Sequence, residues 1–171
     1  MELKKESIQM LRIKNKATSQ VTFDEDYNVP DVKPDIGRMV QSKAEVSMDE
    51  VRLSEGRALL KGTLNVDLLY VGEKEGKIYS LSAKLPMDEV INLEGIEGGD
   101  KLCLNWEIED LSVHMIHSRK LNIKAIVTFY AVVDEMAGIQ LPVEISEEGI
   151  SVKRKKVRLM SLMVHKKDTM R

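Results

Sequence analysis

Apolar and polar residues alternate along much of this chain with a period of two. The clearest case is Leu102–Ile108, where every even-numbered position is apolar and the positions between carry Cys, Asn and Glu. Leu64–Tyr70 and Leu121–Val127 show a similar alternation. Such alternation is typical of strands with one buried face and one wet face. The pattern therefore predicts an all-β, mainly antiparallel chain.

Short polar segments separate these apolar runs. Ser54–Arg57 and His117–Arg119 are short enough to be hairpin turns. Residues 72–76 and 94–100, both rich in Gly and Glu, lead into further strands. Many short strands joined by polar turns indicate a sandwich or a partly open barrel.

The segment Tyr27–Gln41 breaks the pattern. Pro30 and Pro34 lie four residues apart and exclude a central strand. Lys33 is expected to be extended, because it precedes a proline. Pro34 suits the first position of a helix, so the sequence predicts one short helix near residues 34–40, with an apolar side that plugs one end of the sheet.

Two internal similarities bear on the domain organisation. Residues 51–66 resemble residues 113–123, since both read as a strand, a tight turn ending in Arg, and a strand containing Leu-Asn-Val or Leu-Asn-Ile. This similarity favours a duplicated hairpin. Residues 152–160 resemble residues 3–11, since each has a basic start followed by an apolar-rich run. Either these are two unrelated edge strands, or a second copy of the domain begins near residue 150. We therefore expect a β domain over residues 1–149 and a C-terminal strand segment over residues 150–171.

Charge and cysteine content narrow the function class. The 171 residues carry a formal net charge of −2, which gives no electrostatic reason to expect a nucleic-acid or membrane partner. The single cysteine, Cys103, excludes an intrachain disulfide and suits a reducing compartment. The first residues lack the apolar stretch of a signal peptide, and no apolar run reaches the roughly 20 residues that span a bilayer. We expect a cytoplasmic protein.

No combination of residues predicts catalysis, a metal site or a cofactor. His114 and His117 are three apart on or near a predicted strand, so they are expected on opposite faces. Phosphate-binding glycine motifs are missing from the sequence, and Gly95, Gly98 and Gly99 lie in an acidic loop. The carboxylate pairs Asp24/Asp26 and Glu107/Glu109 are better explained as the wet faces of strands than as glycosidase pairs. The basic run 153–158 is better explained as a solvated edge strand.

Four ordered blocks resemble the SPOCS domain, a clostridial domain of endospore-forming bacteria. The most distinctive block is Val29–Ile36, with the sequence VPDVKPDI. Lys61–Tyr70, Trp106–Asp110 and Ser118–Ala125 follow with plausible spacing. Together they extend over about residues 15–135, which is most of the chain.

The resemblance implies a role in spore-coat morphogenesis. In SipL-like proteins, such domains precede a LysM module, and these proteins help to attach the coat to the forespore by partnering the basement-layer ATPase SpoIVA. In that family the LysM module is the part tied to SpoIVA and to glycan binding. A location in the mother-cell cytoplasm, at the forespore or spore-coat surface, follows from the same resemblance, and so do spore-coat or SpoIVA-like basement-layer partners. The present sequence has no LysM-like segment, which weakens the expectation of direct SpoIVA or peptidoglycan binding. Family domains also tend to occur in tandem.

The motif residues are expected either to shape the domain or to contact a partner. In the predicted helix, Asp31 and Asp35 would cap the N-terminus, and Arg38 or Arg119 would pair with one of them. A role in folding and a role in direct binding both remain open. The residues concerned are Val29, Pro30, Asp31, Val32, Lys33, Pro34, Asp35, Ile36, Arg38 and Arg119.

We therefore expect a non-catalytic protein–protein interaction module, with strand edges as a route to binding or self-association. The alternative is a carbohydrate-binding β-sandwich that acts on cortex or coat glycans, which requires a surface row of aromatic side chains. The aromatic candidates are Tyr70, Tyr79, Trp106 and Tyr130, and the period of two assigns most of them to the buried face.

Overall fold

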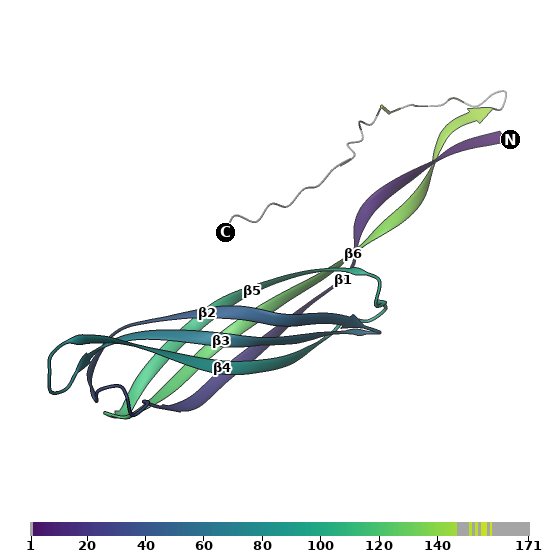
Figure 1. Cartoon of the computed structure of the whole chain (residues 1–171). Coiled ribbons are helices and arrows are strands. Elements are labelled where there is room, and N and C mark those ends of the chain that lie inside the picture. Colours follow the sequence, from purple (N-terminus) through teal and green to yellow (C-terminus); the bar gives the residue numbers. More distant parts are fainter. Residues whose placement is uncertain (1, 147–150, 152, 154, 157, 159–171) are drawn as a thin grey trace. The chain divides into compact units, whose positions relative to one another are not determined.

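The computed structural model describes residues 2–146, 151, 153, 155, 156 and 158. Within these residues the chain is built from six long strands (Figure 1). Their bounds are β1 (Glu2–Asn28), β2 (Ile36–Ser54), β3 (Arg57–Gly72), β4 (Ile78–Asn92), β5 (Lys101–His117) and β6 (Lys120–Ser146). The predicted all-β class is confirmed.

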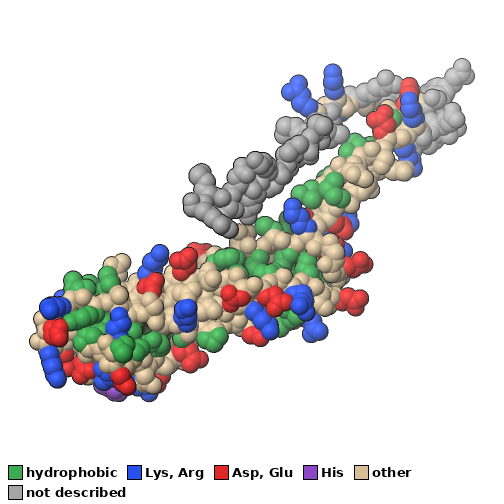
Figure 2. All heavy atoms as spheres, in the orientation of Figure 1, with side chains coloured by type: hydrophobic (Ala, Val, Ile, Leu, Met, Phe, Trp, Pro, Cys, Tyr) green, Lys and Arg blue, Asp and Glu red, His purple; other side chains and the backbone are tan. Residues whose placement is uncertain are grey.

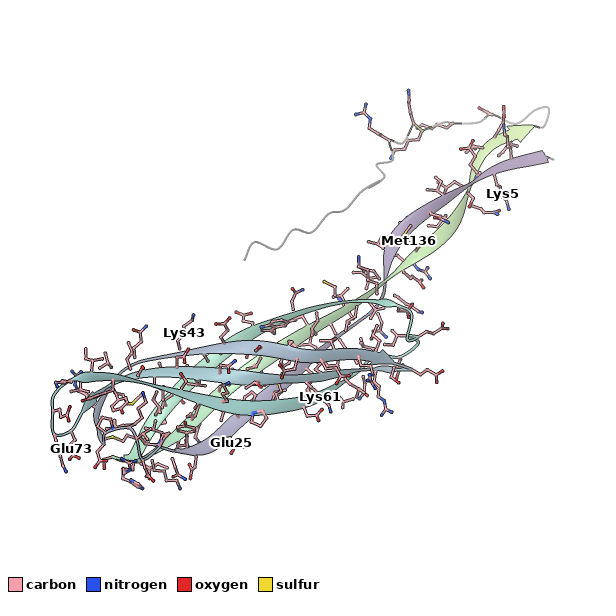
Figure 3. All side chains as sticks on the ribbon, viewed as in Figure 1. Lys5, Glu25, Lys43, Lys61, Glu73 and Met136 are labelled. Atoms are coloured by element: carbon pink, nitrogen blue, oxygen red, sulfur yellow. The ribbon has the colours of Figure 1, made fainter. Side chains whose placement is uncertain are left out.

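The strands form two three-stranded antiparallel sheets, one with the order β1-β6-β5 and the other with the order β2-β3-β4. β3 and β6 are the central strands, and their inward side chains make the core. Tyr70 and Leu64 in β3 and Phe129 in β6 are fully buried. Outward side chains of β2 and β3, such as Lys43 and Lys61, are exposed (Figure 3). The arrangement is that of a sandwich.

The chain divides into two compact units, Met10–Ala137 and a smaller unit made of Met1–Gln9 with Gly138–Arg171. The larger unit holds the core. In the smaller unit, the end of β6 exposes Ile139, Leu141 and Val143. The predicted boundary near residue 150 lies outside the described residues, as does much of the predicted C-terminal strand. Its described residues, at positions 151, 153, 155, 156 and 158, are exposed and lie outside strands.

The predicted helix near residues 34–40 is wrong, because residues 36–40 form the start of β2. Ile36 pairs with Gly72 and Met39 with Tyr70, so the backbone finds its partners on β3. A Cβ atom at Gly37 would lie 2.9 Å from the Cα atom of Glu73, so only glycine allows this close approach at the first bulge of β2. Pro34 precedes a strand here, which is a position that proline tolerates. No helix that could cross a membrane occurs among the described residues.

Both predicted hairpins are present. β2 turns into β3 through Glu55 and Gly56, and Gly56 adopts the left-handed φ of 72° that favours glycine. β5 turns into β6 through Ser118 and Arg119. The two hairpins lie in different sheets and place their second strands, β3 and β6, at the two sheet centres. The duplication itself remains a prediction.

The two places where the sheets meet edge to edge differ in their bonds. In the β1–β4 seam, Ser19 Oγ donates to Glu89 Oε1 at 2.7 Å and the Tyr27 hydroxyl donates to the Ser82 carbonyl at 3.2 Å. Beyond β4, Asn15 Nδ2 also donates to the Glu94 carbonyl at 2.6 Å. In the β2–β5 seam the two strands run close to each other, but no side-chain hydrogen bond or ion pair joins them in the described part of the chain.

Candidate functional site

Arg119, in the turn between β5 and β6, gathers the segment Val29–Asp35 around its guanidinium group. Its Nη1 donates to Asp35 Oδ1 at 2.7 Å and to the Lys33 carbonyl at 3.1 Å. Its Nη2 donates to the carbonyls of Val29 and Pro30, each at 3.0 Å. Four acceptors from one short segment therefore meet the fixed fork of a guanidinium group.

Backbone hydrogen bonds hold the same segment at both ends. The Val29 N–H donates to the Arg119 carbonyl at 2.9 Å, and the Ile36 N–H donates to the Ser118 carbonyl at 2.8 Å. At the far side, the Glu73 N–H donates to the Asp35 carbonyl at 2.9 Å. The segment that connects β1 to β2 is thus fastened to the β5–β6 turn and to the β3–β4 turn.

The pKa shifts of Arg119 and Tyr70 agree with these hydrogen bonds. The hydrogen bond to Asp35 raises the pKa of Arg119 above its ordinary value, so the guanidinium stays cationic. Burial raises the pKa of Tyr70, and the nearby charge of Arg119 opposes that shift. The Tyr70 hydroxyl therefore stays protonated and donates to the Pro34 carbonyl at 3.0 Å.

The segment is buried at its ends and exposed at its tip. Val29 and Ile36 belong to the core, whereas Pro30, Asp31 and Val32 are exposed, with Val32 at 89%. Asp31 lies 3.4 Å from Arg119 with its side chain fully open to solvent, so this ion pair contributes little. The anchors thus suit folding, and the tip is available for contact.

The sequence-predicted residues separate into two groups. Asp31 and Asp35 both pair with Arg119, which was one of the two predicted partners. Arg38 is exposed on β2, and the structure records no ion pair between it and either carboxylate. Because the predicted helix is absent, the two carboxylates cap no helix.

The sequence did not indicate that Tyr70 and Tyr79 form part of this site. Tyr70 lies beneath Pro34, and its ring centre is 5.8 Å from that of Tyr79. A Cβ atom at Gly72 would lie 2.9 Å from the Tyr79 ring, so glycine makes room for it. The signal available was the position of Tyr70 at the end of the Lys61–Tyr70 block, but no local pattern connects that strand end to Pro34.

A second polar cluster lies on the outer face of β1 and β6. Asn122 Nδ2 donates to Asp24 at 2.9 Å and to Asp26 at 3.1 Å. Lys124 pairs with Asp24 at 2.9 Å and Lys120 with Asp26 at 2.7 Å. The carboxylates of Asp24 and Asp26 are therefore neutralised by neighbours, as on the wet face of a sheet.

No group of three or more His, Cys, Asp or Glu side chains is placed to hold a metal ion within the described residues. Cys103 is exposed and pairs with Val132 near the start of β5, whereas His114 pairs with Asn122 near its end. The His117 Nδ1 atom accepts the N–H of Arg119 at 3.2 Å, which braces the turn. These side chains do not converge on one point, and His165 lies outside the described residues.

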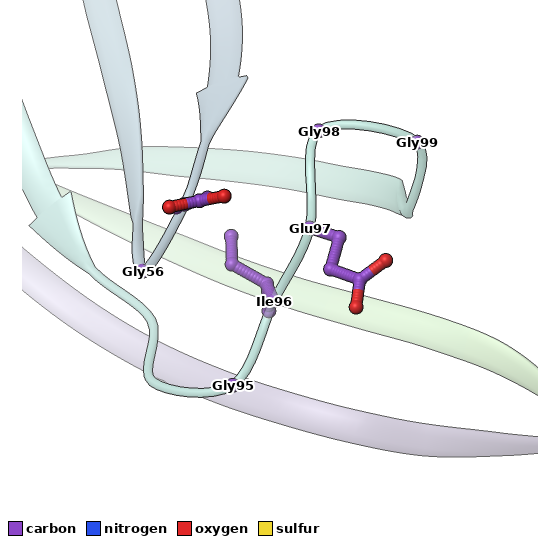
Figure 4. A pocket seen from close by; sticks show the side chains of 7 residues that line it. Gly56, Gly95, Ile96, Glu97, Gly98 and Gly99 are labelled. Atoms are coloured by element: carbon purple, nitrogen blue, oxygen red, sulfur yellow. The ribbon is translucent and has the colours of Figure 1, made fainter.

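A shallow hollow lies between the β2–β3 turn and the β4–β5 loop (Figure 4). Its lining is mostly glycine backbone with two acidic side chains, Glu55 and Glu97, and the buried Ile96. The Gly56 N–H donates to the Ile96 carbonyl at 3.4 Å, which ties its two walls together. With two carboxylates and no cationic or aromatic side chain, the hollow does not suit a phosphate or a sugar.

Comparison with known proteins identifies the family. Residues 35–116 match the family model described as SipL, SPOCS domain. Neither a curated protein nor a solved structure gives a significant match. The matched region begins at Asp35 and spans β2, β3, β4 and nearly all of β5. Residues 35–116 therefore match the SPOCS domain of the SipL family, and this match implies a sporulation-related protein.

Proposed function

We propose that this chain is a non-catalytic protein–protein interaction module of a spore-coat morphogenesis protein. The observation that carries the proposal is the SPOCS-domain match over residues 35–116. The hydrogen bonds of Arg119 support it, because they hold the segment Val29–Asp35 in place and leave its tip, Pro30–Val32, exposed. Such a scaffold presents surfaces instead of a reaction centre.

The proposed setting is the mother-cell cytoplasm at the forespore or spore-coat surface, with spore-coat or basement-layer proteins of the SpoIVA type as partners. These assignments are supported by the family match over residues 35–116. In this setting the domain would bind other coat proteins through an exposed loop tip or a strand edge.

A tagged chain in sporulating cells tests the proposal. We expect a fluorescent fusion to collect at the forespore surface, and we expect cross-linking followed by affinity capture to recover a coat or basement-layer protein. A diffuse signal through the mother cell, with no coat protein captured, would contradict it.

A folding role and a binding role of the segment Val29–Ile36 can be separated with the Asp31→Ala and Asp35→Ala variants. Asp35 bonds to Arg119 at 2.7 Å, so we expect the Asp35→Ala chain to melt at a lower temperature. Asp31 is fully exposed, so we expect the Asp31→Ala chain to keep its melting temperature. Loss of capture by the Asp31→Ala chain alone would make the loop tip a contact surface.

The aromatic side chains do not favour the carbohydrate-binding alternative. Tyr70 is fully buried. Trp106 and Tyr130 are exposed, but Trp106 pairs with Phe129, the neighbour of Tyr130, so the two side chains point to opposite faces of the sheet. A flat row of three exposed aromatic rings does not occur in the described part of the chain.

A further inference from the structure

The end of β6 is an amphipathic strand that has only one neighbouring strand. β6 pairs with β5 from Lys120 to Asp134, and after Asp134 its only neighbour in the sheet is β1 within the described residues. Pro142 lies in this part of β6, as expected for a strand with an unpaired edge, because proline has no N–H to donate to a further strand. Two-stranded ribbons of this kind are marginally stable in water unless one face packs against another element.

One face of this ribbon carries apolar side chains that the described residues leave partly open. Ile139, Leu141 and Val143 occupy alternate positions of β6 and are between 38% and 42% exposed. We name these three residues the β6 stripe. Gln140 and Glu144 lie on the opposite face and are exposed as well. Figure 2 shows hydrophobic side chains exposed along the part of the chain that holds the end of β6. Such alternation is typical of a strand with one buried face, so the β6 stripe calls for a cover.

An apolar segment follows β6 closely in the sequence. Six of the eight residues 157–164 are Val, Leu or Met, and charged runs stand before and after them. Met160, Leu162 and Val164 repeat the period of two that Ile139, Leu141 and Val143 show in β6. In an extended backbone these three side chains share one face, so the segment offers an apolar surface of matching length.

The connecting residues are long enough to bring this segment back to β6. Residues 147–156 lie between Ser146, the end of β6, and the segment. An extended chain advances roughly 3.3 Å per residue, so this connection spans up to about 33 Å. The β6 stripe begins and ends at Val143 and Ile139, about 10 Å and about 23 Å along the strand from Ser146. The described residues of the connection, at positions 151, 153, 155 and 156, are exposed and lie outside strands, as expected of a linker.

We propose that residues 157–164 fold back over the end of β6 and cover the β6 stripe. A second copy of the chain would also bury these side chains, but the tether favours the segment of the same chain. Through a short linker the segment is present at an effective concentration on the order of 1 mM, which is about a thousandfold above a second copy at about 1 µM. The inference concerns the chain's own residues and does not depend on the proposed coat partners.

Disulfide cross-linking in the full chain tests this contact. In a Cys103→Ser background, Leu141→Cys places a thiol on the apolar face of β6, and Gln140→Cys places one on the opposite face. Each change is combined with Leu162→Cys, and the chain is oxidised at a concentration of about 1 µM. We expect an intrachain disulfide to form at least about tenfold faster in the Leu141 pair than in the Gln140 pair, because only the first pair brings its thiols within bonding distance.

Hydrogen exchange gives an independent measurement with matched charge changes. Met160→Asp with Leu162→Asp should speed the exchange of the amides of Ile139–Ile145 by about tenfold, because two carboxylates are costly to bury against the β6 stripe. Ser151→Asp with Thr169→Asp makes the same change in net charge outside the segment and should leave these rates unchanged. Exchange at the amides of β3 should stay the same in both variants, since the core of the sandwich is not altered.

Four results would overturn the inference. Equal disulfide rates in the two cysteine pairs would mean that the segment does not prefer the apolar face of β6. Disulfides that form only between chains would make a second copy the occupant. Unchanged exchange in the Met160 and Leu162 variant would mean that this segment does not cover the β6 stripe, and equal acceleration in the Ser151 and Thr169 variant would reduce the effect to charge. Capture of coat proteins from cells is measured separately, so the proposed function can fail while this inference holds.

Discussion

The β1–β4 seam and the β2–β5 seam join the same two sheets. Side-chain hydrogen bonds cross the β1–β4 seam, which we call the closed seam. Among the described residues no side-chain hydrogen bond or ion pair crosses the β2–β5 seam, which we call the open seam. Ser19 and Tyr27 reach from β1 to Glu89 and Ser82 on β4. Across the other seam, β2 and β5 only lie close to each other. The structure thus closes one side of the sandwich with specific bonds.

Both strands of the β2–β5 seam carry bulges. The β2–β3 register shifts at three places and the β5–β6 register at two, whereas the β3–β4 register is continuous. Bulges therefore interrupt both strands of the β2–β5 seam, and regular stretches such as Gln41–Met48 and Lys101–Ile108 lie between them. The comparison teaches that the seam without side-chain bonds is bordered by two bulged strands, and bulges make a strand a poorer template for pairing with another chain.

The largest expected effect contrasts Phe129 with its cross-strand partner Trp106. Phe129→Ala should lower the free energy of unfolding by about 3–5 kcal/mol, because it leaves a cavity in a closed core. Trp106→Ala should cost only about 1–2 kcal/mol, since 41% of that residue is already exposed. Urea denaturation of both variants measures the difference. Equal losses would mean that Trp106 contributes to the core as much as Phe129 does.

The next effect concerns Arg119, which holds the connection between β1 of the closed seam and β2 of the open seam. Arg119→Ala should lower Tm by about 5–10 °C, because several carbonyl oxygens lose their donor at once. Arg119→Lys should recover only part of this, since an ammonium group cannot reproduce the planar fork. Thermal melting followed by circular dichroism compares the three proteins. Full recovery of Tm in the Arg119→Lys chain would mean that Arg119 acts only through its positive charge.

A smaller effect is expected from opening the closed seam. Ser19→Ala should lower the free energy of unfolding by about 0.5–1.5 kcal/mol, and Tyr27→Phe by a similar amount, since each removes one hydrogen bond to β4. Hydrogen exchange in the double variant should become faster at β4 amides and stay unchanged at β5 amides. Faster exchange on β5 instead would show that the two seams are not independent.

The smallest effect is on the pH dependence of stability. Hydrogen bonds from Asn122 and Lys124 lower the pKa of Asp24 below 3.8, and bonds from Lys120 and Asn122 do the same for the pKa of Asp26. Because both pKa values are depressed in the folded chain, their stabilisation is present above pH 3.8 and is lost as the pH falls through the folded values. The Asp24→Asn and Asp26→Asn variants should show a flatter fall in Tm below pH 4. An unchanged slope would assign acid unfolding to other carboxylates.

Part of the candidate site could be predicted from local residues. Tight turns need few contacts from elsewhere, so the turns at Ser54–Arg57 and His117–Arg119 were predicted correctly. That Arg119 faces both Asp31 and Asp35 was not fixed by the turn, because these residues come from a distant segment. The helix near residues 34–40 was predicted wrongly, because the propensity of Pro34 to start a helix is small compared with the pairing of Ile36 and Met39 with β3. The role of Tyr70 depends on the same pairing and has no local signal.

The order of apolar and polar residues by itself determined that this chain is built from strands, because a period of two allows one buried face only in an extended backbone. It also determined where the hairpins turn, because turn chemistry is local. Only the tertiary structure decided which strands became sheet edges, and that Trp106 is exposed while Phe129 opposite it is buried. The physical reason is that burial depends on what covers a strand, and the covering residues come from distant parts of the chain.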